Sequence, residues 1–132
     1  MKLESTKVII EKPSQIVFNF LKDVKNFKPL MPDNISRFEL IDDETFLFAL
    51  SGMPEIILKK KPLVNPNIIT LEAARGKLKF SLNTIIRDIS EKKSEVYLKF
   101  EGEFNPMMAM MIKGPISKFI DTLALNISKN CN

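Results

Sequence analysis

The chain has 132 residues, of which 45% are hydrophobic and 27% are charged, values that are ordinary for a globular protein. A chain of this length is expected to form one domain, residues 1–132, and to bury roughly two-thirds of its unfolded surface. The formal net charge is +4, but lysines and glutamates are interspersed, and the densest basic run is Lys59–Lys61. We interpret this run as a solvated strand end and expect no binding to nucleic acid.

Histidine is absent, and Cys131 is the single cysteine, in what we interpret as a C-terminal tail. These two facts exclude a His/Cys metal site and every Ser–His or Cys–His nucleophile pair, so we expect no metal and no cofactor. No disulfide can form within the chain, and neither a signal peptide nor an apolar run of about 18 residues is visible. We therefore expect a cytoplasmic protein that is not integral to a membrane.

A strand and two short helices are expected first. Residues 3–12 alternate between apolar and polar side chains, and Pro13 ends the strand because it cannot donate to a ladder. Ser14 suits the N-cap of a helix whose apolar residues recur at helical spacing through Val24. A second short helix is expected at Asn26–Met31.

From residue 35 onward the apolar pattern changes to the alternation that is typical of strands. Short polar turns, one of them at Arg75–Lys77, separate the segments, which indicates an antiparallel meander. The six expected strands are Ile35–Ile41, Thr45–Leu50, Glu55–Lys61, Ile68–Ala74, Leu78–Ile89 and Glu95–Phe104.

The alternation within these strands predicts a sheet with one apolar face and one mostly wet face. Glu101 and Glu103 fall on the wet face, so we interpret them as solvated rather than as an acid/base pair. The apolar face is made by Phe46, Phe48 and Leu50, then Leu78, Phe80, Leu82, Thr84 and Ile86, and finally Val96, Leu98, Phe100, Gly102 and Phe104.

One long helix, expected at Pro106–Ser128, must cover the apolar face of the sheet. Its predicted stripe contains Met108, Ile112, Ile116, Phe119, Ile120, Leu123 and Ile127.

Two features of this helix stand out. Four of the seven methionines fall at its start, Met107, Met108, Met110 and Met111, where flexible thioethers suit either a variable ligand or an irregular gap between helix and sheet. Gly114–Pro115 predicts a kink or a break inside the pattern.

The segment from Pro13 to Pro32 resembles the N-terminal signature of the START-like, Bet v 1-like superfamily, which includes the polyketide cyclase/dehydrase and lipid-transport (SRPBCC) proteins. In that signature a strand ends in Pro, an apolar–aromatic pair follows, an Asp lies near the end of the first helix, and an apolar–Pro pair closes the second. Phe18 stands where Trp is common in the family. The matching positions are Pro13, Val17, Phe18, Leu21, Asp23, Phe27, Leu30, Met31 and Pro32, and the expected element order then matches over the whole chain.

The resemblance implies an α+β, helix-grip (Bet v 1-like) fold, with a seven-stranded antiparallel sheet wrapped around a long C-terminal helix and two short helices between strands one and two. It also implies binding or transport of a hydrophobic small molecule, lipid-like or aromatic, in a cavity between sheet and helix. The matched residues are structural, so no catalytic residue is carried over. The expected lining residues are Phe46, Phe48, Leu71, Phe80, Leu82, Thr84, Leu98, Phe100, Met108, Met111, Ile112 and Phe119.

Two alternatives stay open. A cyclase- or hydrolase-type enzyme of the same fold would need an ionisable group in the cavity, and Lys60 is the main candidate. A protein-interaction module without a ligand would use the outer face of the sheet, as a monomer or a homodimer, through a patch formed by Leu47, Ile57, Ile68 and Ile85.

Three further residues have two interpretations each. Arg75 and Arg87 could recognise an anion at the cavity mouth, although surface ion pairs are the more common role of such arginines. Gly102 leaves room beside it, which either a ligand or another side chain would fill.

Overall fold

The computed structural model describes residues 1–74 and 79–131, so the turn expected at Arg75–Lys77 and the strand start expected at Leu78 lie outside the described residues. The elements in chain order are β1 (Lys2–Glu4), β2 (Val8–Ile10), α1 (Ser14–Leu21), the 3-10 helix η1 (Val24–Leu30), β3 (Ile35–Asp42), β4 (Thr45–Leu50), β5 (Ile56–Lys60), β6 (Ile68–Ala73), β7 (Phe80–Ser90), β8 (Lys93–Gly102) and α2 (Pro106–Cys131). The predicted α+β order, with two short helices after the first strand segment and one long helix at the end, is confirmed.

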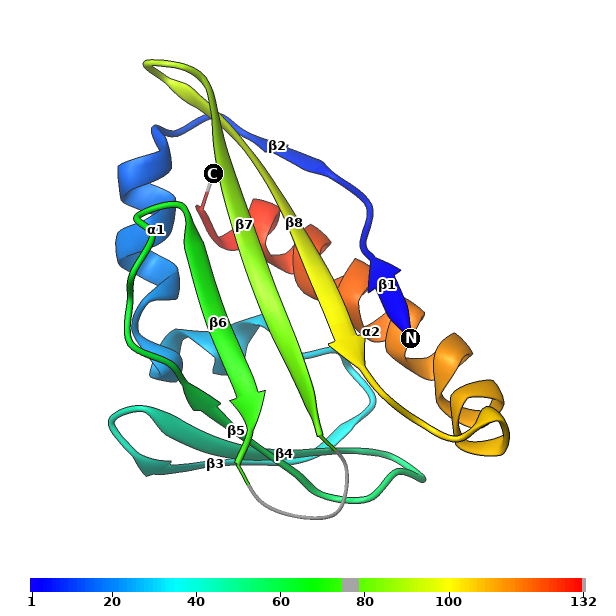
Figure 1. The fold of residues 1–132 in the computed structure, drawn as a ribbon. Helices are drawn as coiled ribbons and strands as arrows, with labels where there is room; N and C mark the ends of the chain where they lie inside the picture. Colours follow the sequence, from blue (N-terminus) through cyan, green and yellow to red (C-terminus); the bar gives the residue numbers. More distant parts are fainter. Residues whose placement is uncertain (75–78, 132) are drawn as a thin grey trace.

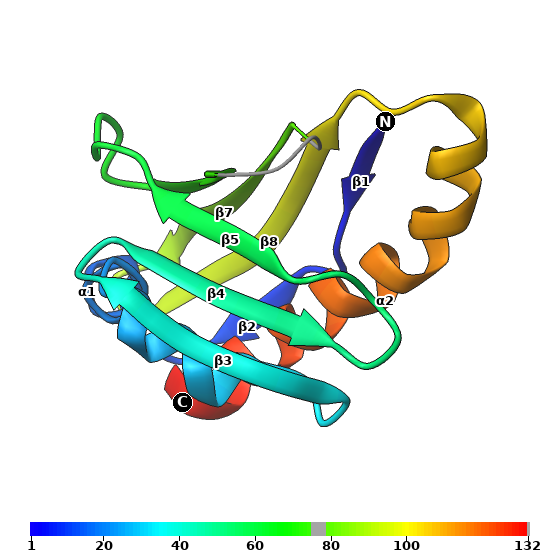
Figure 2. The ribbon, with the colours of Figure 1, turned by 90° about the horizontal axis from the view of Figure 1, so that it is seen from below.

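One antiparallel sheet contains all the strands, in the order β1-β8-β7-β6-β5-β4-β3, with β2 also paired to β8 (Figure 1). The sheet bends strongly, so that β3, β4 and β5 form one wing and β6, β7 and β8 form another (Figure 2). The long helix α2 runs along the concave side of this sheet. This arrangement is the predicted grip of a curved sheet on its C-terminal helix.

The first predicted strand, residues 3–12, is divided into β1 and β2. At the division, the side-chain hydroxyl of Ser5 accepts a hydrogen bond from a backbone N–H of β8 in place of a backbone carbonyl. The Leu98 N–H donates to the Ser5 hydroxyl oxygen at 2.8 Å, while the Ser5 N–H donates to the Leu98 carbonyl. A side chain in a backbone role shifts the pairing locally, which alternation alone does not predict.

Helix starts are fixed by local polar contacts. The N-cap of α1 is Pro13 rather than Ser14, and its carbonyl accepts the N–H groups of Ile16 and Val17. At the start of α2, the Asn105 side-chain oxygen accepts the Met108 N–H at 2.8 Å, and Pro106 occupies the first helical position as predicted.

The core lies between the concave face of the sheet and one stripe of α2. In β7 and β8 the buried residues alternate with outward neighbours that are half-buried or exposed, as the alternation predicted, whereas β4 is buried along its whole length. Burying each aliphatic side chain of such a stripe stabilises the fold by about 1.5–3 kcal/mol. The α2 stripe that meets the sheet consists of Ile112, Ile116, Phe119, Ile120, Leu123, Ala124 and Ile127.

Gly114 and Pro115 lie inside α2, which nevertheless continues as one helix from Pro106 to Cys131. Pro115 has no N–H, so the carbonyl of Met111 loses its partner in the helix, and the first turns of α2 run in a different direction from the rest (Figure 2). Glycine before the proline removes the Cβ that would clash with the proline ring. The Gly–Pro pair therefore bends the helix without dividing it.

Cys131, interpreted from the sequence as part of a tail, is instead the last residue of α2 and is buried. Burial raises the pKa of its thiol above the ordinary value, because the thiolate would lose its hydration. The buried thiol is therefore expected to be a poor nucleophile.

Two measurements check this expectation. Labelling of Cys131 by a thiol-exchange reagent is expected to be at least about tenfold slower in the native protein than in urea, because burial lowers both the fraction of thiolate and the access of the reagent. Because the thiol pKa is higher in the folded state, the buried neutral thiol contributes fully to the free energy of unfolding below the unfolded thiol pKa of about 8.5. This contribution is lost as the pH rises through the folded pKa. Cys131→Ala should remove that decline, and equally fast labelling in both states would contradict the burial.

Candidate functional site

Most of the residues that were expected to line a cavity lie between the sheet and α2. Phe80 and Met108 are partly buried, and Met111 is exposed. The other expected residues are buried: Phe46, Phe48, Leu71, Leu82, Thr84, Leu98, Phe100, Ile112 and Phe119.

Ring contacts fill much of the space that these residues enclose. On the β4 side, Phe48 stacks on Phe119 of α2 with ring centroids 5.1 Å apart, and Phe46 stacks on Phe27 at 5.6 Å. The expected cavity is therefore occupied near β4 by protein side chains.

A second group of rings fills the end of β7 and β8. The Phe80 and Phe100 centroids are 5.0 Å apart, and Phe104 stacks on Phe100. A Cβ added at Gly102 would lie 2.7 Å from the Phe104 ring and 2.8 Å from the Phe80 Cβ. The room beside Gly102 thus holds protein side chains, which is one of the two interpretations that the sequence left open.

Met111 does not line the sheet–helix interface as expected, because 67% of it is exposed. The α2 stripe is centred on Ile112, Ile116 and Phe119, and at 100° per residue Met111 projects to one side of that stripe. Met107 and Met110 are also exposed, so Met108 is the methionine of this cluster that packs against the core.

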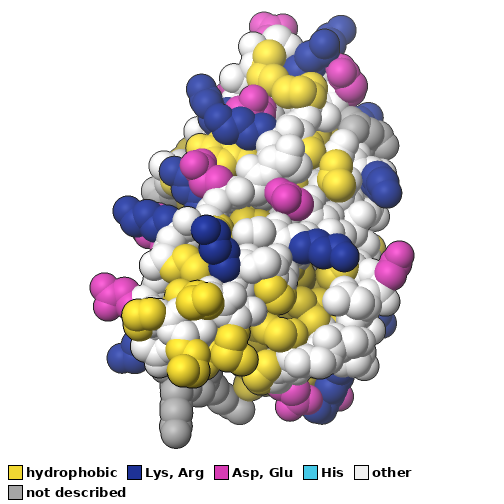
Figure 3. All heavy atoms as spheres, turned by 90° about the vertical axis from the view of Figure 1, so that its right-hand side faces the viewer, with side chains coloured by type: hydrophobic (Ala, Val, Ile, Leu, Met, Phe, Trp, Pro, Cys, Tyr) yellow, Lys and Arg dark blue, Asp and Glu magenta, His cyan; other side chains and the backbone are white. Residues whose placement is uncertain are grey.

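Open space between the sheet and α2 is found at the mouth of the fold, in a groove of ≈360 Å³ that we call the α2 groove. Figure 3 shows hydrophobic side chains gathered in a hollow on the face of the molecule that carries the start of α2. The residues that line the groove are Pro32, Asn34, Leu50, Ser51, Met53, Gly114, Pro115, Lys118, Phe119 and Thr122.

Three separate segments build this groove. The loop after η1 contributes Pro32 and Asn34, and the turn after β4 contributes Ser51 and Met53. That turn requires Gly52, whose φ of 81° lies in the left-handed region. The third wall is the bent part of α2.

Phe119 is the one expected lining residue that also lines the α2 groove. Sequence reasoning missed the other groove residues because four of them, Pro32, Asn34, Ser51 and Met53, come from loops whose positions depend on long-range contacts, and the rest lie in β4 and α2 where those loops meet them. One signal was available: the Gly114–Pro115 pair marks the bend in α2 that forms the third wall.

A larger hollow of ≈730 Å³ lies at the end of the sheet, and we call it the sheet-end hollow. Its walls combine charged outward side chains, among them Glu72, Glu101 and Glu103, with Phe80 and Gly102. Arg75, with its suggested anion contact, lies outside the described residues. We take the α2 groove as the candidate site because its floor is apolar and lies between sheet and helix.

The polar residues considered for catalysis or anion binding have structural contacts. The Lys60 ammonium donates to the Lys22 carbonyl at 2.7 Å, just after α1, and Lys60 does not line the α2 groove. Arg87 forms a surface ion pair with Glu95 at 3.7 Å. In residues 1–74 and 79–131, no three His, Cys, Asp or Glu side chains converge as a metal site would require.

The outer face of the sheet does not form the contiguous apolar patch that was considered for a partner. Leu47 pairs with Ile57, and Ile68 pairs with Ile85. Leu58 lies opposite Ala73, so Ile57 is next to Ala74 at the end of β6 that is opposite to Ile68, and the two apolar pairs are separated along that strand.

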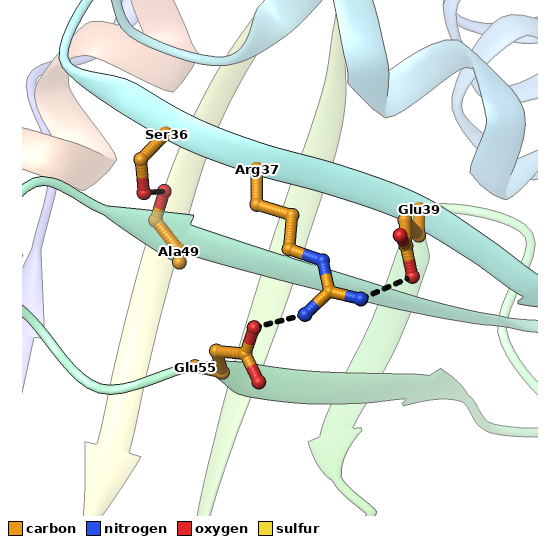
Figure 4. Close-up of polar contacts among 5 residues, drawn as sticks. All are labelled: Ser36, Arg37, Glu39, Ala49 and Glu55. Atoms are coloured by element: carbon orange, nitrogen blue, oxygen red, sulfur yellow. Dashed lines mark hydrogen bonds and ion pairs between the residues drawn. The ribbon is translucent and has the colours of Figure 1, made fainter.

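Leu47 is buried on this outer face although it points away from the core. Next to it, Arg37 of β3 binds the carboxylates of Glu39 and Glu55 (Figure 4). Both carboxylates raise the pKa of the Arg37 guanidinium, Glu39 more than Glu55. This polar network holds the Glu55 carboxylate on the outer face.

Solved structures resemble the chain over nearly its whole length. A START superfamily protein from Mycobacterium smegmatis superposes with a TM-score of 0.75 at 11% identity, covering 98% of this chain and 96% of that one. Norcoclaurine synthase from Thalictrum flavum gives 0.78 at 11% identity over 98% and 85% of the two chains. The Zhui aromatase/cyclase from Streptomyces sp. R1128 gives 0.77 at 10% identity over 99% and 93%.

These likenesses show the fold, and the chain has the START-like, Bet v 1-like helix-grip fold that the sequence predicted. No protein-family model and no curated protein matches the chain. Among the helices of residues 1–74 and 79–131, none has both the length and the apolar character needed to cross a bilayer.

Thr84 is the expected lining residue with a polar side chain, and it lies in the core rather than in the α2 groove. It is 1% exposed, between Ile69 and Leu98 on the neighbouring strands, and its hydroxyl has no hydrogen-bond partner among the described residues. A buried hydroxyl without a partner lowers stability by about 1–3 kcal/mol.

Thr84→Val is therefore expected to raise the free energy of unfolding by about 1 kcal/mol, because valine keeps the shape and removes the unpaired hydroxyl. Thr70→Val is the matched control, since the Thr70 hydroxyl donates to Asn83 Oδ1 at 2.6 Å. That change should lower the free energy of unfolding by about 1 kcal/mol. Urea unfolding measures both, and destabilisation of similar size in the two variants would contradict our account of Thr84.

Proposed function

We propose that this protein binds a hydrophobic small molecule in the α2 groove, with the apolar part of the ligand against Leu50, Met53 and Phe119. The observation that carries the proposal is an open groove between sheet and helix whose floor is apolar. Its volume of ≈360 Å³ is near the lower end of ligand sites, which are roughly 300–1,000 Å³. A compact ligand, a medium-length chain or one or two rings, suits this volume.

The groove has the composition of a ligand site. Leu50 and Phe119 are 5% exposed and form a rigid floor, while Met53 is partly buried and adds an adaptable wall. A few polar groups stand at the rim, from Asn34 and Thr122, as is usual for sites that orient a mostly apolar ligand.

The structural neighbours support a ligand-binding role without naming a ligand. They include a START superfamily protein, an aromatase/cyclase and a norcoclaurine synthase in complex with dopamine and hydroxybenzaldehyde. Those two compounds are ligands of that synthase. For this chain, the neighbours support small-molecule binding as a use of the fold.

The enzyme alternative required ionisable groups that converge in the cavity. Lys118 is the one ionisable side chain among the described residues that line the α2 groove, and Lys60 is bound to the carbonyl of Lys22. Neither observation favours catalysis, so binding or transport is the function we propose. We place the protein in the cytoplasm, on the ground that its single cysteine is a free thiol.

Tryptophan fluorescence can test the proposal, because the chain has no tryptophan of its own. Phe119→Trp places one reporter in the floor of the groove, and Met110→Trp places the matched control on an 84% exposed position of the same helix. Titration with decanol below its solubility limit should shift the emission of the Phe119→Trp variant to shorter wavelengths and saturate. The emission of the Met110→Trp variant should not change.

Thermal unfolding of the wild-type protein provides an independent measurement. A ligand that binds the folded state at 100 times its dissociation constant stabilises by about 2.7 kcal/mol, which raises the melting temperature by several degrees. If no medium-chain or aromatic compound shifts the melting temperature or the emission of the Phe119→Trp variant, the proposed function is wrong.

A further inference from the structure

Lys118 is the charged side chain of the α2 groove, and among the described lining residues it stands alone in that respect. It belongs to α2, is exposed at the rim, and shares the groove wall with Phe119 and Thr122. In the described part of the chain, no carboxylate lies within ion-pair distance of its ammonium. The groove therefore combines an apolar floor with one unpaired positive charge.

Two of the neighbouring carboxylates are engaged by other groups. Asp121, one helical turn further along, accepts the Thr6 N–H at 2.7 Å. Glu55, two residues after the groove residue Met53, is bound by Arg37 on the outer face (Figure 4). Asp33 is exposed between Pro32 and Asn34 but does not line the groove. The charge of Lys118 is thus left for a group that enters from solvent.

Two neutral donors stand near the same rim. The side-chain amide of Asn34 and the hydroxyl of Thr122 line the groove and have no hydrogen-bond partner among the described residues. The Ser51 hydroxyl, in contrast, already donates to the Asn34 carbonyl at 3.0 Å. One cation with two free donors at its side matches an oxyanion better than a neutral head group.

We propose that the ligand of the α2 groove is an amphipathic molecule with a single anionic head group, a carboxylate or a phosphate monoester. This inference rests on the proposed function and names the class of ligand. The head group binds the Lys118 ammonium at the rim, and the apolar part lies on Leu50, Met53 and Phe119. Since the groove is short, the apolar part is a medium-length chain or a small ring system.

The experiment compares decanoate, decyl phosphate and decanol, which share one apolar chain and differ in the head group. Dissociation constants are measured by calorimetry at concentrations where none of the three compounds aggregates, at about pH 7.5, where a carboxylate is ionised. Wild-type protein should bind at least one of the two anions several-fold more tightly than decanol. Which of the two binds more tightly decides between the head groups.

Lys118→Gln is expected to weaken binding of that anion roughly tenfold, the scale of one charge-assisted hydrogen bond, and to leave decanol binding unchanged. Lys113→Gln is the matched control, because Lys113 is exposed on the same helix and does not line the groove. It should leave all three affinities unchanged. Both lysines are exposed, so neither change should affect folding.

The outcomes separate this inference from the proposed function. If decanol binds wild-type protein as tightly as both anions do, the head-group inference is overturned while the proposed function stands. The head-group inference is also overturned if Lys113→Gln weakens anion binding as much as Lys118→Gln, because the effect is then one of overall charge. If none of the three compounds binds, the head-group inference is overturned for medium-length chains, and the proposed function fails as well if aromatic compounds also leave the melting temperature and the emission of the Phe119→Trp variant unchanged.

Discussion

The packing of the α2 stripe on the concave face of the sheet determines the rest of the structure. Phe119 stacks on Phe48 of β4 at 5.1 Å, while Ile120, Ala124 and Ile127 are fully enclosed between helix and strands. A strongly bent sheet exposes an apolar inner face that no strand can cover, so the helix supplies most of the buried partner surface. The α2 groove opens where this contact ends.

The bend in α2 is the reason that the contact ends where it does. Without an N–H at Pro115, the helix loses one hydrogen bond and changes direction, and Gly114 adds no side chain to the groove wall. A Cβ at Gly114 would meet no neighbouring atom within 4 Å. The structure thus gives up helix stability at one point and gains an open wall beside Leu50 and Met53, consistent with a functional use of that wall.

The sequence predicted the fold well because its two periodicities are local. Rows such as Val96, Leu98 and Phe100 repeat every second residue, and the α2 stripe repeats at helical spacing, so each element reports its own buried face. Element ends were less predictable. Ser5 divided the first strand through a side-chain contact with Leu98, ninety-three positions away in the chain, which no local pattern records.

The α2 groove could not be predicted from the sequence, for a related physical reason. Alternation predicts that side chains such as Phe46, Leu82 and Leu98 point inward, but it does not predict whether another side chain already fills the space in front of them. The methionine cluster shows the same limit, because its composition suggested a lining while its angular position on α2 left Met111 exposed. Open space is a property of contacts between distant segments, here two loops and a bent helix. The unpaired charge of Lys118 also depends on contacts between distant segments, because Asp121 accepts a hydrogen bond from Thr6 and Glu55 is bound by Arg37.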